Sequence, residues 1–213
     1  MHVVGTAVIG AKATPDQAQK WLKPAASGEL VATLAFSERA TGALFYMPEI
    51  KAEQSDGGFV LNGRKSFVTS GGHADLYPVL VNASGEPGLD VLVLSGTDKG
   101  VSFEGSWEGV GMSGNSSVQM VLNDVTIPAD RLLGAEGAGQ ELVFNVVAPT
   151  FLLGLAAVNL GIAQAALDTT VNHVKTRKNA GGVLAELPTV QTQLAEMSLI
   201  TEQARSLLLT AAK

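Results

Sequence analysis

The sequence predicts an α+β protein in which a β-rich block precedes a helical block. From Leu30 onward, β-branched and aromatic residues alternate with polar residues between turn signals, a pattern typical of strands. After Pro128 the alternation gives way to long apolar stretches at three- and four-residue spacing, which is typical of helices. Strands followed by helices favour an antiparallel β-barrel or sandwich-like middle domain, followed by part of an α-helical bundle domain.

A short helix near the amino end has a clear start signal. Thr14 places a hydroxyl at the N-cap, Pro15 occupies the first helical position, and Gln17 can complete a capping box. Pro24 is expected to end this helix, because proline has no amide hydrogen for the helical ladder.

Six segments of the β-rich block have the composition of strands. Asn62 and Gly63 stand between two of them and tolerate the positive φ that a tight turn needs, so a hairpin tip is expected there. Further turns are expected at Gly71 and Gly72 and across 111–114. The expected strands are 31–36, 59–61, 65–69, 76–81, 91–94 and 117–125.

Two helices are expected in the second block. Residues 141–178 read as one long helix with an irregularity at Pro149, ended by Gly181 and Gly182, and 188–213 form the other. Two helices cannot bury apolar faces this wide against each other, so further helices or another subunit are expected to cover them. The apolar face of the last helix carries Val190, Leu194, Met197, Ala204, Leu208 and Ala211.

Composition and charge exclude several classes of function. The 213 residues include 20 acidic and 14 basic side chains without runs, so the sequence lacks the basic stripe of a nucleic-acid-binding protein. It has no cysteine for disulfides, and His73 and His173 stand apart from other ligands, so no metal site is expected. Because the first residues lack signal-peptide features and no run reaches about 18 apolar residues, we expect a cytoplasmic protein without a membrane span.

Five stretches of sequence carry a resemblance to a known family. LAFSERATGA is similar to a strand ending in LTEPGAGS, and FVLNGRKSFVTSGGHAD is similar to YVLNGxKxWITNGxxAD. VGMSGNSSVQMVLNDVTIPADRLLGAEGAG is similar to LGxRxSxxxxxxFxxVxVPxxNLLGxxGxG. LGIAQAALD and VQTQLAEM correspond to helices that open a C-terminal domain. On these motifs the chain resembles the acyl-CoA dehydrogenase family over essentially its whole length.

The resemblance implies a flavoprotein truncated at both ends. Residues 1–29 would be a remnant of the N-terminal helical domain, 30–134 the flavin-facing middle β domain, and 135–213 the first helices of the C-terminal helical domain. Such enzymes of lipid metabolism remove two hydrogens from Cα and Cβ of an acyl-CoA thioester: a carboxylate takes the α proton, and FAD accepts the β hydride. The implied partners are FAD, acyl-CoA, and acyl-CoA dehydrogenase-like subunits in a homo- or hetero-oligomer.

The resemblance also assigns the site residues. The hydroxyls of Ser37 and Thr69 would address the polar edge of the isoalloxazine, and Phe67 would form an aromatic wall. Arg177 would reach the flavin pyrophosphate across a subunit interface, and a solvated cation at a helix end explains this residue nearly as well. The cofactor-binding set is Leu34, Phe36, Ser37, Gly42, Phe67, Val68, Thr69 and Arg177, and the substrate-binding set is Ala43, Phe151 and Leu152.

No catalytic residue is nominated. Phe151 stands at one family location of the catalytic glutamate, and the other location lies beyond residue 213. Glu38 is assigned a structural hydrogen-bonding role. The prediction is therefore an acyl-CoA dehydrogenase fragment that lacks its catalytic base. The alternative is a non-catalytic structural or interaction subunit of a heteromeric acyl-CoA dehydrogenase, favoured by altered motif positions such as Arg39, Ala180 and Pro188; a related flavin oxidase or monooxygenase stays open.

Overall fold

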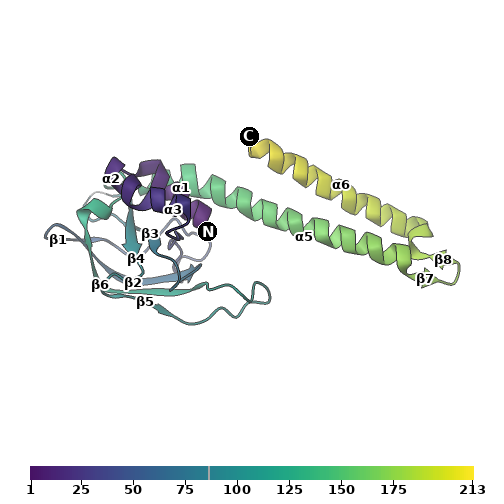
Figure 1. Ribbon diagram of the computed structural model, residues 1–213, viewed down its shortest axis with the longest axis horizontal. Coiled ribbons are helices and arrows are strands. Elements are labelled where there is room, and N and C mark those ends of the chain that lie inside the picture. Colours follow the sequence, from purple (N-terminus) through teal and green to yellow (C-terminus); the bar gives the residue numbers. More distant parts are fainter. Residues whose placement is uncertain (86) are drawn as a thin grey trace. The chain divides into compact units, whose positions relative to one another are not determined.

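The computed structural model describes residues 1–85 and 87–213 (Figure 1). These residues form two compact units, Met1–Ala148 and Pro149–Lys213. The first unit contains antiparallel sheets with short helices and the second is mainly helical, so the predicted α+β class is confirmed. The finer division into three domains, with boundaries after residues 29 and 134, stays a prediction.

Short helices open the first unit. They are α1 (His2–Lys12), α2 (Pro15–Gln17), the π-helical η1 (Ala18–Leu22) and α3 (Lys23–Ser27). The capping box is confirmed: Thr14 Oγ1 accepts from the Gln17 amide at 3.3 Å, and Gln17 Oε1 accepts from the Thr14 amide at 2.9 Å. The expected end at Pro24 is wrong, because Pro24 lies in the first turn of α3, where the missing amide hydrogen costs little. Gly28, with a φ of 83°, ends the helix instead. The helix α1 has no counterpart among the expected elements.

Two antiparallel sheets form the body of the first unit and share one core. The first sheet has the order β1 (Glu53–Ser55), β2 (Gly58–Val68), β6 (Val118–Pro128) and β5 (Val101–Glu104), and the second consists of β3 (Leu76–Asn82) and β4 (Leu89–Ser95). Leu61 and Ile127 of the first sheet belong to the same buried cluster as Val79 and Leu92 of the second. The opposite face of the second sheet, including Val91, packs against α1. Because both faces of β3 and β4 are buried, their sequences do not alternate and are mostly apolar, with Asp90 as a buried exception.

The predicted hairpin tip at Asn62 and Gly63 is wrong. Both residues lie inside β2, which is one strand where two were expected, and the register with β6 shifts there. Gly63 has a φ of 145°, and the Asn62 side chain exchanges hydrogen bonds of 2.8 and 3.0 Å with Asp124. The feature is therefore a β-bulge whose extra residue lies in β6, where Asn123 and Asp124 stand opposite Asn62. The tight turn stands earlier, at Asp56 and Gly57 between β1 and β2.

The expected strand at 31–36 is also wrong. Among the described residues, the segment is bridged to β3 only at Ala32 and Ala35, in parallel orientation. A continuous parallel ladder would need an amide donor from residue 78 between these bridges, and Pro78 has none. The segment therefore lies along β3 as extended chain without becoming a strand.

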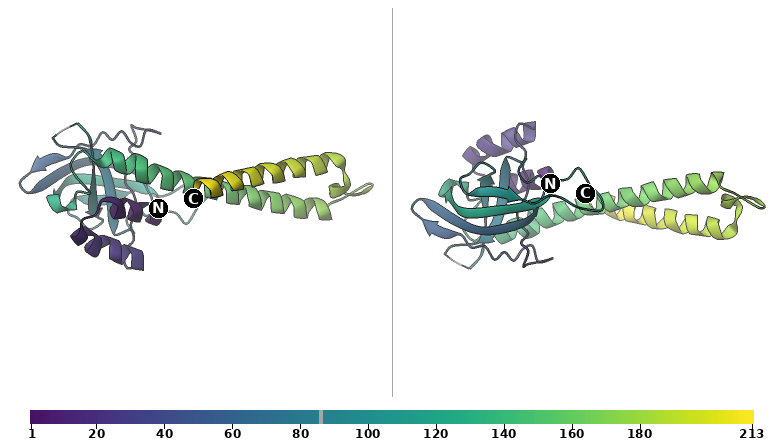
Figure 2. Two further views of the ribbon diagram at one scale, coloured as in Figure 1. Left: turned by 90° about the horizontal axis from the view of Figure 1, so that it is seen from above. Right: turned by 90° about the horizontal axis from the view of Figure 1, so that it is seen from below.

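An antiparallel helix pair makes up most of the second unit, as predicted (Figure 2). The helices are α5 (Ala148–Thr176) and α6 (Pro188–Ala211), and Arg205 Nη2 donates to Gln164 Oε1 at 2.6 Å between them. The expected irregularity at Pro149 is a π-helical turn, η3 (Val143–Val147), which ends just before it. The remaining elements are η2 (Ala129–Arg131), α4 (Gly139–Leu142), β7 (Lys178–Asn179), β8 (Gly182–Val183) and η4 (Leu184–Glu186).

Large apolar side chains of the second unit stay at the surface. Ile162 is 64% exposed and Leu207 is 71% exposed. As the sequence predicts, the two helices do not cover their own apolar faces. By length and composition, the 38-residue helical run Gly139–Thr176 could cross a membrane, whereas no membrane span was predicted from the sequence. The apolar face of a bundle helix meets the same criterion, so this single helix is weak evidence for a span.

Candidate functional site

A cleft of about 650 Å³ opens beside the end of β2 in the first unit. Three of the predicted site residues line it, namely Ser37, Gly42 and Phe67. Ser66 and Ser117 line it too, although they are not among the predicted site residues. Their positions in the sequence could have indicated them, because Ser66 directly precedes Phe67 and Ser117 stands at the start of the predicted strand 117–125.

Phe67 presents its ring at the cleft in an uncommon backbone conformation. Its φ is 53° and its side chain is 71% exposed. The register between β2 and β6 shifts a second time between Lys65 and Val68, so Phe67 lies in a bulge. Bulges re-aim side chains, and left-handed backbone at a residue other than glycine or asparagine is often found at functional sites. The arrangement suits an aromatic side chain meant to contact a ligand rather than the core.

Thr69 does not line the cleft directly, but its hydroxyl reaches a residue that does. Thr69 Oγ1 lies 3.0 Å from Ser117 Oγ, and Asn115 Nδ2 donates to the same Ser117 oxygen at 2.8 Å. Thr33 Oγ1 donates to Thr69 O at 2.7 Å. A chain of hydroxyl and amide groups thus joins the end of β2 to the start of β6.

Other predicted cofactor residues point their side chains elsewhere. Leu34 and Phe36 are buried in the cluster that packs on α1, and Val68 is buried in the core between the sheets. For these three residues only the main chain is left to face a ligand. Ala43, predicted to face the substrate, is exposed on the loop that follows Ser37.

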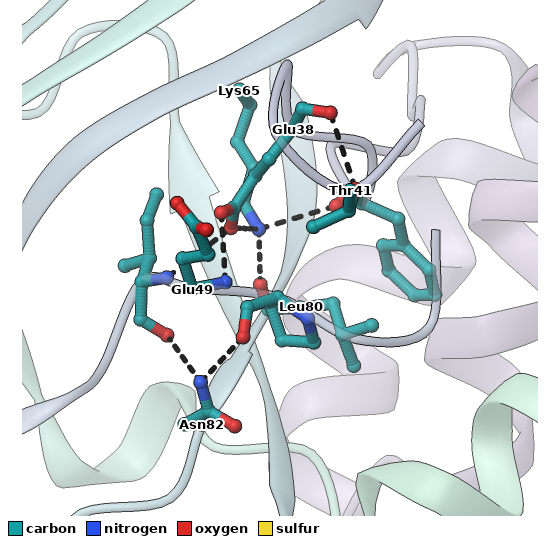
Figure 3. A network of polar contacts seen from close by, with 9 residues as sticks. Glu38, Thr41, Glu49, Lys65, Leu80 and Asn82 are labelled. Carbon is teal, nitrogen blue, oxygen red and sulfur yellow. Dashed lines mark hydrogen bonds and ion pairs between the residues drawn. The ribbon is translucent and has the colours of Figure 1, made fainter. Parts of the chain in front are cut away.

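Glu38, which lines the cleft, forms a buried ion pair with Lys65 (Figure 3). Lys65 Nζ donates to Glu38 Oε1 at 2.6 Å, to Phe36 O at 3.2 Å, and to Leu80 O. Glu38 also accepts from the Glu49 amide at 2.8 Å, so the structural role predicted for this carboxylate is confirmed. Burial lowers the pKa of Lys65 from 10.5 to about 8, and the attraction of Glu38 offsets only part of that shift.

The comparisons with known proteins agree with this geometry. Residues 33–125 match the model of the acyl-CoA dehydrogenase middle domain, and residues 153–213 match that of the acyl-CoA dehydrogenase C-terminal domain. The chain belongs to the acyl-CoA dehydrogenase family. All residues that line the cleft lie within the match to the acyl-CoA dehydrogenase middle domain.

Three related proteins illustrate the extent of the match. The chain is 30% identical over 203 residues to the mitochondrial 2-methylacyl-CoA dehydrogenase of Solanum tuberosum, covering 94% of this chain and 49% of that relative. Butyryl-CoA dehydrogenase from Megasphaera elsdenii superposes with a TM-score of 0.91 at 28% identity, covering 97% and 55% of the two chains. An acyl-CoA dehydrogenase from Bacillus anthracis, complexed with FAD, superposes with a TM-score of 0.88 at 25% identity, covering 96% and 36%. The chain thus spans about half the length of the first two relatives and about a third of the last.

Three of the predicted site residues, Phe151, Leu152 and Arg177, belong to the second unit. Arg177 lies within the match to the acyl-CoA dehydrogenase C-terminal domain, and Phe151 and Leu152 lie just before it. Arg177 is exposed just after α5, where its amide donates to His173 O at 2.8 Å. Phe151 is 40% exposed and Leu152 is 60% exposed. Leu152 lines an apolar groove of about 690 Å³ between α5 and α6. Of the predicted site residues, only Ser37, Gly42 and Phe67 of the first unit line the cleft.

Both carboxylates that line the cleft are engaged by cations. Glu38 is held by Lys65, and Glu104 forms a 2.6 Å ion pair with Arg64. An acyl-CoA dehydrogenase needs a carboxylate that is free to take a proton, and neither of these two is presented in that way. Within the described residues, no group of three or more His, Cys, Asp or Glu side chains could hold a metal ion.

Proposed function

We propose that this chain forms the flavin-facing part of a FAD-dependent acyl-CoA dehydrogenase that acts on acyl-CoA thioesters in lipid metabolism. The observation that carries the proposal is that Ser37 and Gly42, from one segment, and Phe67, from β2, line one cleft. The family membership and the FAD complex of the Bacillus anthracis relative support it.

The residues of the cleft fit an isoalloxazine ring in size and chemistry. A volume of about 650 Å³ is within the range of small-molecule sites. The exposed ring of Phe67 can stack on a flat aromatic ligand, while the hydroxyls of Ser37, Ser66 and Ser117 can hydrogen-bond its polar edge. When bound, FAD would supply the acceptor for the β hydride. The residues of this chain would bind the ring and exclude water from one of its sides.

The substrate and subunit contacts are part of the same proposal. Ala43, Phe151 and Leu152 would approach the acyl-CoA, and Arg177 would reach the flavin pyrophosphate of a neighbouring subunit as a bidentate donor. The apolar groove between α5 and α6 supports association with further helices or subunits. The proton-abstracting carboxylate is not proposed on this chain.

A non-catalytic structural or interaction subunit of a heteromeric acyl-CoA dehydrogenase is the second candidate. It is favoured by the engagement of Glu38 and Glu104, which leaves the cleft without a free base. Mixing the chain with a full-length relative distinguishes the candidates. If the chain co-migrates with the relative in size-exclusion chromatography and changes its activity, the proposal of a non-catalytic subunit is supported. If the two proteins migrate separately, the proposal that the chain is the flavin-facing part of an enzyme is supported.

The test of the flavin site is a titration of the purified chain with FAD, followed by absorbance and fluorescence. We expect weak binding that Phe67→Ala lowers at least tenfold, because the ring provides the stacking surface. Phe144→Ala is the matched control, since Phe144 is also exposed, at 46%, and lies outside the cleft lining. Equal affinity of Phe67→Ala and the parent chain would reject the proposed site.

A further inference from the structure

Lys65 and its neighbour Ser66 donate hydrogen bonds to three consecutive residues of the facing segment, 36–38. The Lys65 ammonium donates to Phe36 O at 3.2 Å and to the Glu38 carboxylate at 2.6 Å. The Ser66 amide donates to Ser37 O at 2.8 Å. Ser37 is therefore held at its own carbonyl and at both adjacent residues, which restricts the direction of its hydroxyl at the cleft.

The same ion pair closes the loop that carries Gly42. Glu38, at the start of the loop, accepts from the backbone amides of Glu49 at 2.8 Å and Ile50 at 3.4 Å, at its end. The two ends of the loop thus meet at one buried carboxylate, and Lys65 balances its charge (Figure 3). A carboxylate left in this place without a cation would be strongly disfavoured.

A contribution to the stability of the fold does not by itself explain the ion pair between Lys65 and Glu38. Both side chains are almost fully buried, at 0% and 5% exposure. The lowered pKa of Lys65 means that the loss of hydration outweighs the attraction between the two charges. Buried ion pairs of this kind are often no more stabilising than apolar replacements of similar size, while their directional hydrogen bonds define geometry.

We propose that Lys65 is a positioning residue of the flavin cleft, acting through Phe36 and Glu38 to set the Ser37 hydroxyl and the loop that carries Gly42. The inference rests on the proposed function for its ligand, but its geometry is testable without that ligand. Lys65 itself is fully buried and does not line the cleft, so it would act through its neighbours.

The experiment compares three variants of the full chain with the parent. Lys65→Met removes the ammonium, and the double variant Lys65→Met with Glu38→Gln also removes the charge left behind. Leu133→Ala is the control. Leu133 is fully buried in the cluster between α1 and the second sheet, and it does not line the cleft. Removing its side chain should therefore destabilise the first unit without changing the cleft. FAD is the probe, and amide hydrogen exchange reports on the backbone.

We expect both Lys65 variants to bind FAD at least tenfold more weakly than Leu133→Ala and to show an altered flavin spectrum. The double variant is expected to regain thermal stability but not flavin affinity. The amides of Glu49 and Ser66 should exchange at least tenfold faster in Lys65→Met than in Leu133→Ala.

The inference would be overturned if Lys65→Met matched the Leu133→Ala control in FAD affinity and in amide hydrogen exchange. It would also be overturned if the double variant fully recovered the FAD affinity of the parent. If Lys65→Met does not fold, the comparison of the double variant with the control decides in the same way. If the parent takes up no FAD, the proposed function fails. The exchange rates then decide the positioning role separately, because equal rates in Lys65→Met and the control would reject it.

Discussion

The hydroxyl oxygens of Thr69 and Ser117 lie 3.0 Å apart, across the end of β2 and the start of β6. Asn115 already donates to the Ser117 oxygen, so the Ser117 hydrogen is available for Thr69 or for a ligand in the cleft. This contact links a predicted flavin residue to one that only the fold brings to the cleft.

Replacing Ser117 by alanine is expected to weaken FAD binding about tenfold, or ~1.4 kcal/mol, which is typical of one lost hydrogen bond. The free energy of unfolding should fall by about 1 kcal/mol or less. Flavin fluorescence titration and urea unfolding measure the two effects. Ser102→Ala, an exposed position on β5 outside the cleft lining, should change neither, and a parental affinity for Ser117→Ala would contradict the prediction.

Gly63, which lies on β2 next to the bulge in β6, is expected to tolerate no side chain. A Cβ there would lie 2.6 Å from Ile50 Cγ1, and the φ of 145° is unfavourable for other residues. Gly63→Ala should therefore lower the free energy of unfolding by about 1–3 kcal/mol in urea. Gly111→Ala is the control, because a Cβ at Gly111 meets open space. Equal stability of the two variants would show that the bulge can relax.

The stability of the chain is expected to rise with pH above about 8 on account of Lys65. Its pKa is about 8 in the folded chain against 10.5 when unperturbed, so between these values the unfolded chain binds more protons. The free energy of unfolding should then rise by up to about 1.4 kcal/mol per pH unit. Below pH 8 both states carry the charge and this dependence disappears.

Urea unfolding at pH values from 7 to about 9.5 measures this slope. Burial raises the pKa of Tyr77 above 10.0, which acts in the opposite direction at higher pH, so the range stops short of it. The double variant Lys65→Met with Glu38→Gln gives the background from all other groups. A parent curve parallel to that background would mean that Lys65 titrates normally.

The isolated chain is expected to self-associate through its second unit. The groove between α5 and α6 is lined by apolar side chains such as Leu152 and Leu207, and contiguous apolar patches beyond a few hundred Å² are uncommon on monomers. Leu207→Lys should reduce the associated fraction in sedimentation velocity. Val110→Lys, at a fully exposed position of the first unit, should leave it unchanged. A parent chain that is monomeric at micromolar concentration would refute the prediction.

The purified chain with added FAD is expected to dehydrogenate no acyl-CoA above background. A positioned base typically supplies about 10² to 10⁴ in rate, and Glu38 is engaged by Lys65. Anaerobic bleaching of the flavin absorbance with a panel of acyl-CoAs is the measurement. Bleaching at an enzyme-like rate that is lost in Glu38→Gln would identify Glu38 as a base and refute the prediction.

Local sequence signals predicted those parts of the fold that depend on near neighbours along the chain. The capping box at Thr14 and Gln17 and the strands β3, β4 and β6 follow from residues within a few positions of one another. The helix pair followed from apolar spacing alone. Motif order along the chain likewise pointed to the acyl-CoA dehydrogenase family and to Ser37, Gly42 and Phe67, which the fold gathers at one cleft.

Contacts between distant segments decided the rest. Asn62 and Gly63 suit a tight turn and a bulge equally well, and pairing with Asp124 on β6 selects the bulge. The segment 31–36 has strand composition, but its neighbour in the fold is Pro78, which has no amide to continue the ladder. Lys65 reads as an ordinary surface cation until the fold places Glu38 beside it. Local composition and spacing thus indicated which residues favour helix, strand or ligand contact. Burial and hydrogen-bond partners could not be predicted in this way, because they depend on residues that lie far apart in the chain and meet only in the folded protein.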